Sequence, residues 1–489
     1  MSSRPGSLPL RIRLRRLPNT GQGLRALPSS SLGNSTGNGR AGNQLYRVAA
    51  CCPALAIGSA EVRPNARTVL GVVAALLAPA GVHATPADFF GFGPRSQALA
   101  GTGTALGQGF ETTYSNPALL SRSEQPEAAL GWQAAHFSID VHGPGVDPDI
   151  TSRGLAGTYF GLVLPLPLGG PLQDRIAVGV GTFSPQRLLV RARVLAPERP
   201  QLPLLSDQVQ SLNAAAGLGV DLGYGLSLGM GALALAQVVG DVVVSTNSDG
   251  RVGAQVEEQM VAAYTPVAGL AWDLDGETFL GAAWRGALRA DFDLLVRVED
   301  LGELRLPELN ISGVAQYDPM QLQVEIGQRW QGWAAAVGAT YQRWSAFHGW
   351  LRATVTCPGE APSCEALPTP RIDFQDTIVP RVGVERTLEL GPQAIAAGRL
   401  GYFFEPSPLP EQSEETNLWD NHRHALTLGY GVEVQRPVKL SLDFFYQLHL
   451  LVPRTHEKST QVATSNPGHP RVRVSGSVHN TGLVGTLRF

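Results

Sequence analysis

The chain of 489 residues is poor in lysine, cysteine and methionine, with four cysteines, four methionines and only two lysines. Neither lysine, Lys439 or Lys458, follows a glycine, so the Gly-Lys element of a phosphate-binding P-loop is missing. No apolar run near the amino terminus reaches the about 20 residues that a membrane-spanning helix needs. These absences exclude an ATP-driven motor and argue against a helical membrane anchor.

Basic residues are also scarce after the first 84 positions. Residues 1–84 hold ten arginines and one acid, Glu61, which leaves 28 basic against 40 acidic residues in the rest of the chain. A nucleic-acid-binding protein needs a clustered basic face that replaces the counterions on the phosphates. The charge balance therefore excludes nucleic acid as a partner.

The amino-terminal region has the features of an export signal. An apolar run at residues 69–82 follows two arginines and ends beside a small-residue cleavage site. This pattern predicts a signal peptide over residues 62–84, cleaved after Ala84. Residues 1–61 are rich in Arg, Gly, Ser and Asn without apolar periodicity. We expect them to be an unstructured leader, or to lie before the true start of translation, for which Val62 is one candidate.

Export bears on the interpretation of the cysteines. Cys51 and Cys52 lie in the segment expected to be removed, which leaves Cys357 and Cys364 in a loop that contains Pro and Gly. Exported proteins meet an oxidising environment, so we predict a disulfide between Cys357 and Cys364. A metal site is the alternative, but no His or second Cys pair stands nearby at ligand spacing, and we expect neither a metal nor another cofactor.

After residue 125, apolar residues alternate with small or polar ones in segments of about ten to thirteen residues separated by turn signals. This period of two predicts β-strands. In residues 332–344 one face is apolar and carries Trp333 and Tyr341, which lie roughly 26 Å apart along a strand. Residues 424–435 and 439–450 alternate in the same way and predict an antiparallel hairpin. Strand length and aromatic ends favour a membrane-crossing β-barrel.

The chain ends in Phe489, with apolar or small residues behind it at every second position. A terminal Phe on an alternating strand marks proteins handed to the outer-membrane insertion machinery, so we expect Phe489 to be an assembly signal. A soluble β-sandwich or a secreted solenoid would also alternate, but explains neither the strand length nor this terminal Phe. We therefore predict an all-β, transmembrane antiparallel barrel over residues 125–489, in contact with the lipids of a Gram-negative outer membrane.

The alternation leaves the number of strands open. About fifteen candidates can be counted, whereas single-chain outer-membrane barrels usually have an even number. Residues 309–331 are the least clear segment, because Asp318-Pro319 there is a turn, a bulge or the edge of a constriction. Long extracellular loops are predicted over residues 185–209, 346–372 and 405–422.

The segment between signal peptide and barrel, residues 85–124, is rich in Gly and contains the triplet Asn116, Pro117 and Ala118. The later motifs are VGVGTFSP at residues 178–185, a W-S-x-F element at Trp344, Ser345 and Phe347, and DNHRH at residues 420–424. In this order the chain resembles the FadL-type family of outer-membrane long-chain fatty acid and aromatic hydrocarbon transporters. The resemblance implies a barrel of about fourteen strands whose lumen holds residues 85–124 as a plug, the hatch.

Two aromatic groups are candidates for contact with a ligand. Phe89, Phe90 and Phe92 stand near the mature terminus, where little else explains three aromatics, and we expect them to insert into the lumen as part of a ligand pocket. The element Trp344, Ser345 and Phe347 ends a predicted strand. Its simplest role is in the aromatic girdle at the membrane surface, and the alternative is a platform for the substrate.

Two other patterns have a plain structural interpretation. The glycines at 101, 103 and 107 do not have the G-x-G-x-x-G spacing of a dinucleotide loop and predict tight packing of the hatch. Four histidines would suit a hydrolase only beside an oriented nucleophile, which no motif supplies, so we expect loop and lumen residues and no enzyme. These histidines are His422, His424, His449 and His456.

These observations predict a passive transporter of hydrophobic small molecules. Because no ATP site is present, ligand binding must shift the hatch between closed and open states by differential affinity. Asn116 is expected to tie the hatch to the wall through its amide while Pro117 fixes the chain direction, or the two form merely a rigid turn. The alternatives are a structural or adhesive barrel with a closed lumen and a general polar porin without a plug.

Overall fold

The computed structural model describes residues 86–146, 154–186, 197–206, 213–246, 252–299, 308–349, 351–356, 372–435 and 438–489. They belong to one unit, Pro64–Phe489. The predicted leader, the signal peptide with its cleavage after Ala84, and the disulfide between Cys357 and Cys364 lie outside these residues. No helix within the described ranges is long and apolar enough to cross a membrane.

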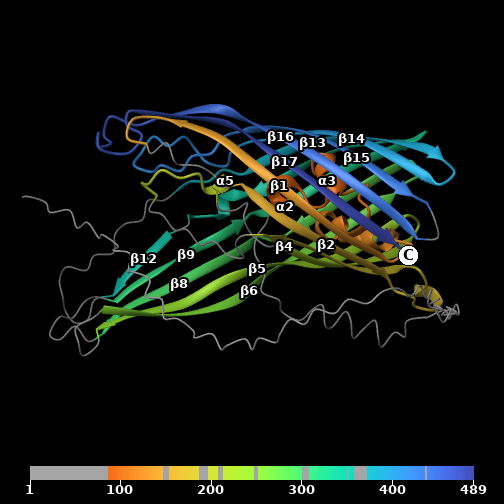
Figure 1. The fold of residues 1–489 in the computed structure, drawn as a ribbon, viewed down its shortest axis with the longest axis horizontal. Coiled ribbons are helices and arrows are strands. Elements are labelled where there is room, and N and C mark those ends of the chain that lie inside the picture. The colour runs from red at the N-terminus through yellow and green to blue at the C-terminus, as the bar shows by residue number, and fades with distance from the viewer. Residues whose placement is uncertain are drawn as a thin grey trace, which may run out of the picture. The chain divides into compact units, whose positions relative to one another are not determined.

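Seventeen strands among the described residues form one sheet, because segments that alternate in sequence pair with their neighbours. Fourteen of them close into an antiparallel barrel, in which β1 pairs with β2 on one side and with β17 on the other (Figure 1). The predicted barrel of about fourteen strands is confirmed. In order round the wall, the strands are β1 (Glu127–His142), β2 (Leu155–Pro165), β3 (Ile176–Pro185), β4 (Asn213–Gly223), β5 (Leu226–Thr246), β6 (Val252–Asp273), β7 (Thr278–Arg285), β10 (Met320–Trp330), β11 (Trp333–Arg343), β13 (Thr377–Gly391), β14 (Ala394–Glu405), β15 (Arg423–Val434), β16 (Lys439–Glu457) and β17 (Arg471–Arg488).

The other three strands leave the wall and form a side sheet on the far half of β5. They are β8 (Leu288–Glu299), which runs parallel to β5, then β9 (Glu308–Asp318) and β12 (Leu351–Thr356). The unclear segment at residues 309–331 is therefore two strands, with Pro319 between them because proline has no N–H to donate to a ladder. A count of strands from sequence thus exceeds the number in the wall.

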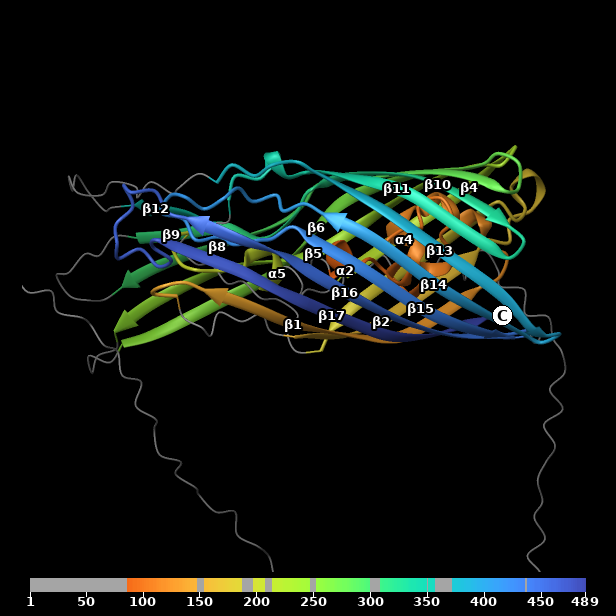
Figure 2. The ribbon, with the colours of Figure 1, turned by 90° about the horizontal axis from the view of Figure 1, so that it is seen from above.

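The two ends of the barrel differ in their connections. Long segments gather at one end, the loop end, whereas short turns and the carboxyl terminus lie at the other, the turn end (Figures 1 and 2). The predicted loops at residues 185–209 and 346–372 are partly regular, since the first contains α5 (Pro203–Ser206) and the second contains β12 and begins where η4 (Trp344–Ala346) ends. One turn-end connection contains η3 (Gly170–Leu172).

The two faces of the wall strands differ as their alternation predicted. In the β15–β16 hairpin, Leu426, Leu428 and Tyr430 are exposed on the outer face, whereas Phe445 and Gln447 are fully buried on the inner face. Large apolar side chains at the outer surface suit a wall surrounded by lipid, and polar side chains within suit a lumen.

The lumen holds the hatch, defined here as residues 86–122, whose short helices lie inside the wall (Figure 2). Short Gly-rich pieces suit this place because glycine permits the left-handed turns at Gly91 and Gly93, both with positive φ. The predicted segment inside the barrel is confirmed. Its helices are α2 (Pro86–Phe90), α3 (Pro94–Ala98), η1 (Gly109–Glu111), α4 (Thr112–Ser115) and η2 (Pro117–Arg122).

Candidate functional site: the hatch and the lumen

The Asn-Pro-Ala part of the hatch lies directly on glycines of the wall. A Cβ at Gly229 of β5 would overlap the backbone of Ala118, and a Cβ at Gly269 of β6 would overlap the side chain of Asn116. Glycine is required at such positions because any side chain would occupy the space of the hatch. On this side, the hatch is therefore held by direct contact between its own atoms and the backbone of the wall strands.

Asn116 uses both the donor and the acceptor group of its amide at this seat. Its Nδ2 donates to the carbonyl of Thr104 at 2.6 Å and to that of Leu270 in β6 at 2.9 Å, and its Oδ1 accepts from Ala118 N at 3.1 Å. The side chain is fully buried, so each contact replaces one with water. Asn116 thus joins two parts of the hatch to the wall, and Pro117 begins η2 beside it.

The glycine run after α3 wraps around a carboxylate of the wall. Glu325 of β10 accepts from Gly103 N and Ala105 N at 2.9 Å each and from Thr104 N at 3.3 Å. Consecutive backbone N–H groups that converge in this way form a nest for an anion. The run therefore serves packing of the hatch, with Glu325 as its fixed anion.

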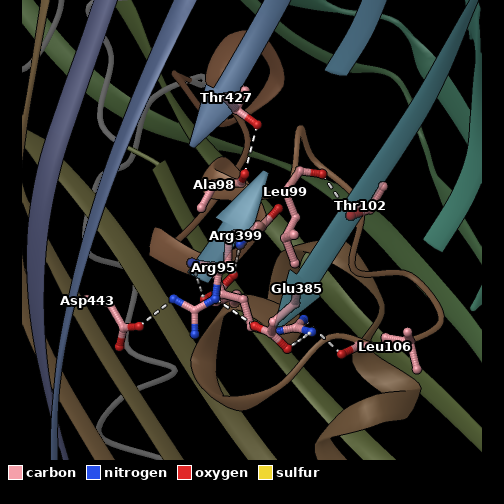
Figure 3. Close-up of polar contacts among 11 residues, drawn as sticks. Arg95, Ala98, Leu99, Thr102, Leu106, Glu385, Arg399, Thr427 and Asp443 are labelled. Carbon is pink, nitrogen blue, oxygen red and sulfur yellow. Dashed lines mark hydrogen bonds and ion pairs between the residues drawn. The ribbon is translucent and has the colours of Figure 1, made fainter. Parts of the chain in front are cut away.

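An ion-pair lattice holds helix α3 to the opposite wall (Figure 3). Arg95 donates to both carboxylate oxygens of Glu385 at 3.0 Å, and Arg399 links Glu385 to Asp443 with two contacts of 2.6 Å. Arg95 also donates to the carbonyl of Leu106 at 2.9 Å. The side chains of the lattice are nearly buried. A bidentate Arg–carboxylate pair fixes the relative orientation of the two side chains in addition to pairing their charges.

Both ends of helix α3 have hydrogen-bond partners. Glu111 accepts from Arg95 N at 2.9 Å and Ser96 N at 2.6 Å at the amino end, and Thr427 Oγ1 donates to the carbonyl of Ala98 at 2.8 Å at the other (Figure 3). Burial raises the pKa of Glu111 to about 7, although the backbone N–H groups of Ser96 and Arg95 lower it. The hatch therefore contains one carboxyl that titrates near neutrality.

A network of neutral amides holds the middle of α3. Gln97 Nε2 donates to Tyr159 OH at 2.6 Å, and Asn480 Nδ2 donates to Gln97 Oε1 and to Gln447 Oε1 at 2.9 Å each. Gln133 Nε2 donates to Asn480 Oδ1 at 2.9 Å. All five side chains are buried, and a fully paired network of this kind fixes one arrangement of hatch and wall.

The three hatch phenylalanines lie buried inside the barrel. Phe92 packs edge-on against Tyr159 with ring centroids 5.6 Å apart, whereas Phe89 and Phe90 pack against the wall residue His449 at 5.2 and 5.4 Å. Phe89 also lines a cavity at the loop end. Their insertion into the lumen is thus observed, and their role toward a ligand stays a prediction.

The placement of Trp344 and Phe347 in an outer aromatic girdle is wrong. Both rings are buried in a cluster of loop-end residues, where Trp344 stacks on Phe374 at 5.9 Å and Phe347 stacks on Tyr317 at 4.4 Å. The chain leaves β11 just before Trp344 and turns inward under the loops, so Ser345 is exposed but the aromatics are not. Large outer-face aromatics occur instead at Trp132, Trp272, Trp330 and Trp333.

The four histidines have different hydrogen-bond partners, although His422 and His424 both pack against Phe404. His422 and His456 accept backbone N–H bonds from residues 407 and 412 at the loop end, at 2.9 and 3.1 Å. His424 contacts a tyrosine hydroxyl, and His449 is buried in the lumen. In the described part of the chain, no group of three or more His, Cys, Asp or Glu residues is placed to hold a metal ion.

Two internal cavities lie on either side of the hatch. The loop-end cavity, about 40 Å³, is lined by α2 residues Asp88 and Phe89 and by loop residues. The turn-end cavity, about 260 Å³, is lined by Arg95 and Phe110 of the hatch and by Arg488 of the last strand. The smaller one has space for a few water molecules only. The structure therefore represents a closed arrangement.

Sequence reasoning did not find the charged partners of the hatch. Alternation places Glu325 and Glu385 on inner faces, but their hatch partners lie more than 200 positions away in the sequence, as for Glu385 with Arg95. No local signal records such a pairing. Phe489 is exposed at the turn end, where its N–H donates to the carbonyl of Pro126 at 3.1 Å.

The geometry defines a class of protein, a closed fourteen-strand barrel with an amino-terminal plug. A family model described as outer membrane protein transport protein (OMPP1/FadL/TodX) matches residues 72–489, and the chain belongs to this family of outer-membrane transport proteins. No curated protein matches the chain.

Solved structures are similar in fold at low sequence identity. A Pseudomonas aeruginosa FadL homologue is 14% identical with a TM-score of 0.49, covering 84% of this chain and 99% of its own. The P. putida toluene transporter TodX is 15% identical with a TM-score of 0.49, covering 82% and 99%. A TodX deltaS2S3 mutant, described as a monoaromatic hydrocarbon channel, is 16% identical with a TM-score of 0.50, covering 81% and 99%.

Proposed function

We propose that the protein is a passive transporter that carries hydrophobic small molecules, long-chain fatty acids or aromatic hydrocarbons, across the outer membrane. The observation that carries the proposal is the place of the hatch between the two cavities. Helix α2 lines the loop-end cavity, and α3 with η1 lines the turn-end cavity. A solute that enters from the loop end must therefore displace part of the hatch to pass.

The chemistry of the lumen supports a hydrophobic solute. Such a solute gains about 0.8 kcal/mol for each CH₂ that leaves water for an apolar surface. Phe89, Phe90 and Phe137 provide this surface below the loop end, where they belong to one buried cluster. Since the chain has no P-loop, transport follows an existing gradient, and ligand binding opens the hatch by favouring the open state.

The alternatives fit the lumen less well. A general polar porin needs an open, wide constriction, whereas residues 86–122 fill this barrel. A purely structural barrel has no need of a separate segment held by an ion-pair lattice and an amide network in its lumen. These features favour a gated path.

Three further proposals concern maturation. We propose that the signal peptide is cleaved after Ala84, that Phe489 directs the barrel to the insertion machinery, and that Cys357 and Cys364 form a disulfide. Amino-terminal sequencing that found a residue before Ala80 would contradict the first. Unimpaired assembly after deletion of Phe489 would contradict the second. Stoichiometric thiol labelling of the unreduced, denatured protein would contradict the third.

The transport proposal is tested with purified protein in liposomes. Radiolabelled oleate and toluene should enter protein-containing vesicles faster than empty ones, whereas arabinose should enter both at the same rate. Vesicles that admit arabinose but show no gain for oleate or toluene would show a polar porin. Vesicles that gain none of the three would leave only a structural barrel.

A further inference from the structure

The side chains around Phe89 form a slot that fits one aromatic ring. The guanidinium carbon of Arg423 lies 3.5 Å from the centroid of the Phe89 ring, and the imidazole of His449 stacks on it at 5.2 Å and 14°. Phe90 and Phe137 border the ring at 4.7 and 6.4 Å. Arg423, His449 and Phe137 belong to wall strands, so most of the slot stays in place when α2 moves.

Two polar atoms in this slot have no hydrogen-bond partner among the residues that the structure describes. Arg423 Nε and His449 Nδ1 are both buried and unpaired, although Arg423 Nη2 donates to Glu405. Arg423 is 6% exposed and His449 is fully buried. Buried polar atoms are nearly always paired, so two unpaired atoms beside the same ring offer a ligand group two hydrogen bonds.

The chemistry of the two atoms specifies that group. His449 Nε2 lies 3.3 Å from Gln447 Oε1, which can only accept, so Nε2 carries the hydrogen and Nδ1 is left as an acceptor. The orientation of the Gln447 amide is fixed, because its Nε2 donates to the carbonyls of Phe90 and Gln97 at 2.8 Å each. Arg423 Nε can only donate. A single ligand group that bonds to both atoms must donate to His449 Nδ1 and accept from Arg423 Nε, and a hydroxyl can do both.

We propose that the slot formed by Arg423 and His449 binds a hydroxylated aromatic ring, a phenol, and that Phe89 holds the ring position in the closed state. The inference rests on the proposed transport function and names its ligand class. An aromatic carboxylate can accept but not donate, and it would meet Glu405 and Asp420, which line the adjoining cavity. A hydrocarbon has no hydrogen-bonding group and would leave both polar atoms unpaired.

Binding to the purified full chain in lipid nanodiscs tests the proposal. The ligands are 4-ethylphenol, ethylbenzene and 4-ethylbenzoate, which share a ring and a chain and differ only in the polar group. We expect 4-ethylphenol to bind about tenfold more tightly than either of the others, the effect of one or two good hydrogen bonds. Phe89→Ala should raise the affinity for 4-ethylphenol because the slot is then empty.

The His449→Phe variant isolates the polar contact, since it keeps a stacked ring and removes the acceptor. We expect its preference for 4-ethylphenol over ethylbenzene to fall to about threefold or less, because one hydrogen bond of the two is lost. The matched control is His424→Phe, which replaces an exposed wall histidine bonded to Tyr402 and should change neither affinity.

The outcomes separate this proposal from the transport proposal. Equal binding of the three ligands, tighter binding of 4-ethylbenzoate, an unchanged preference in His449→Phe, or no binding even to Phe89→Ala would each overturn the phenol slot. If His449→Phe does not fold, the ranking of the three ligands by wild type and Phe89→Ala decides alone. Nanodisc binding of 4-ethylphenol without its uptake into proteoliposomes would support the slot and contradict transport.

Discussion

The hatch is held in different ways on its two sides. Around Asn116 and Ala118 it rests on glycines of β5 and β6, where the backbone approaches the wall directly. Around Arg95 and Gln97 it is held by charged, amide and tyrosine side chains of β1, β2, β13, β14, β16 and β17. Glycines meet this side as well, since a Cβ at Gly401 or Gly429 would overlap the end of α3, but the ion-pair lattice and the amide network lie on this side. Both sides should therefore fail when atoms are added, whereas the removal of a partner should cost more on the Arg95 side.

The difference bears on how a gate of this kind opens. Side chains of a lattice can exchange partners with water or ligand, whereas a backbone seated on glycine has no such alternative partners. We therefore expect α3 and α2 to loosen first while the Asn116 side stays seated. The following predictions test this asymmetry in order of expected effect.

The largest effect is expected when the lattice loses its central carboxylate. Glu385→Ala leaves Arg95 buried without a charge partner, and breaking a buried pair in this way costs about 3–5 kcal/mol. The free energy of unfolding, measured by denaturant titration, should fall by that amount, and hydrogen exchange should quicken in α3 before residues 116–118. Glu389→Ala, an exposed change in the same strand, is the control. Uniform exchange across the hatch would contradict the asymmetry.

The next effect comes from adding one methyl group on the glycine side. In Gly229→Ala the new carbon overlaps the backbone of Ala118, and overpacking of this kind costs about 1–3 kcal/mol. Gly398→Ala is the matched control, because no atom of the described part of the chain lies within contact distance of its Cβ. Denaturant titration of the two variants gives the comparison. Equal stability of both would show that the hatch is not seated on Gly229.

Sequence alone predicted the wall and not the attachments. The β15–β16 hairpin followed from alternation, because one face meets lipid and the other the lumen, a contrast that each residue records locally. The contact of Glu385 with Arg95 joins positions 290 apart and leaves no local pattern. Trp344 was misplaced for the same reason, since burial under the loops depends on Tyr317 and Phe374 from distant segments.

A smaller loss is expected at the amide that joins the hatch to β6. Asn116→Ala removes the two amide hydrogen bonds to the carbonyls of Thr104 and Leu270, which costs about 1–2 kcal/mol in the free energy of unfolding. Asn116→Asp keeps the acceptor for Ala118 N but places a buried carboxylate against the same two carbonyls, so it should be less stable than Asn116→Ala. If both variants match wild type in denaturant titration, residues 116–118 form only a rigid turn and do not hold the hatch to the wall.

The smallest effect concerns pH and lies on the lattice side. The pKa of Glu111 rises from its ordinary value of 4.5 to about 7 because the carboxyl is buried. A group whose pKa is raised in the folded state contributes stability below its unfolded pKa and loses that contribution as the pH rises through its folded pKa. Wild type should therefore lose stability between about pH 5 and about pH 8 relative to Glu111→Gln, which stays neutral throughout.

This loss is at most about 1.4 kcal/mol for each pH unit, because only one proton is released. The backbone N–H groups of Arg95 and Ser96 favour the ionised carboxylate and oppose the effect of burial, and the pKa of about 7 already includes their contribution. Denaturant titrations of wild type and Glu111→Gln at both pH values measure the loss directly. A wild type that gains stability relative to the variant as the pH rises would mean that the hydrogen bonds to α3 outweigh burial, and the lattice side would then be tightened by ionisation rather than loosened.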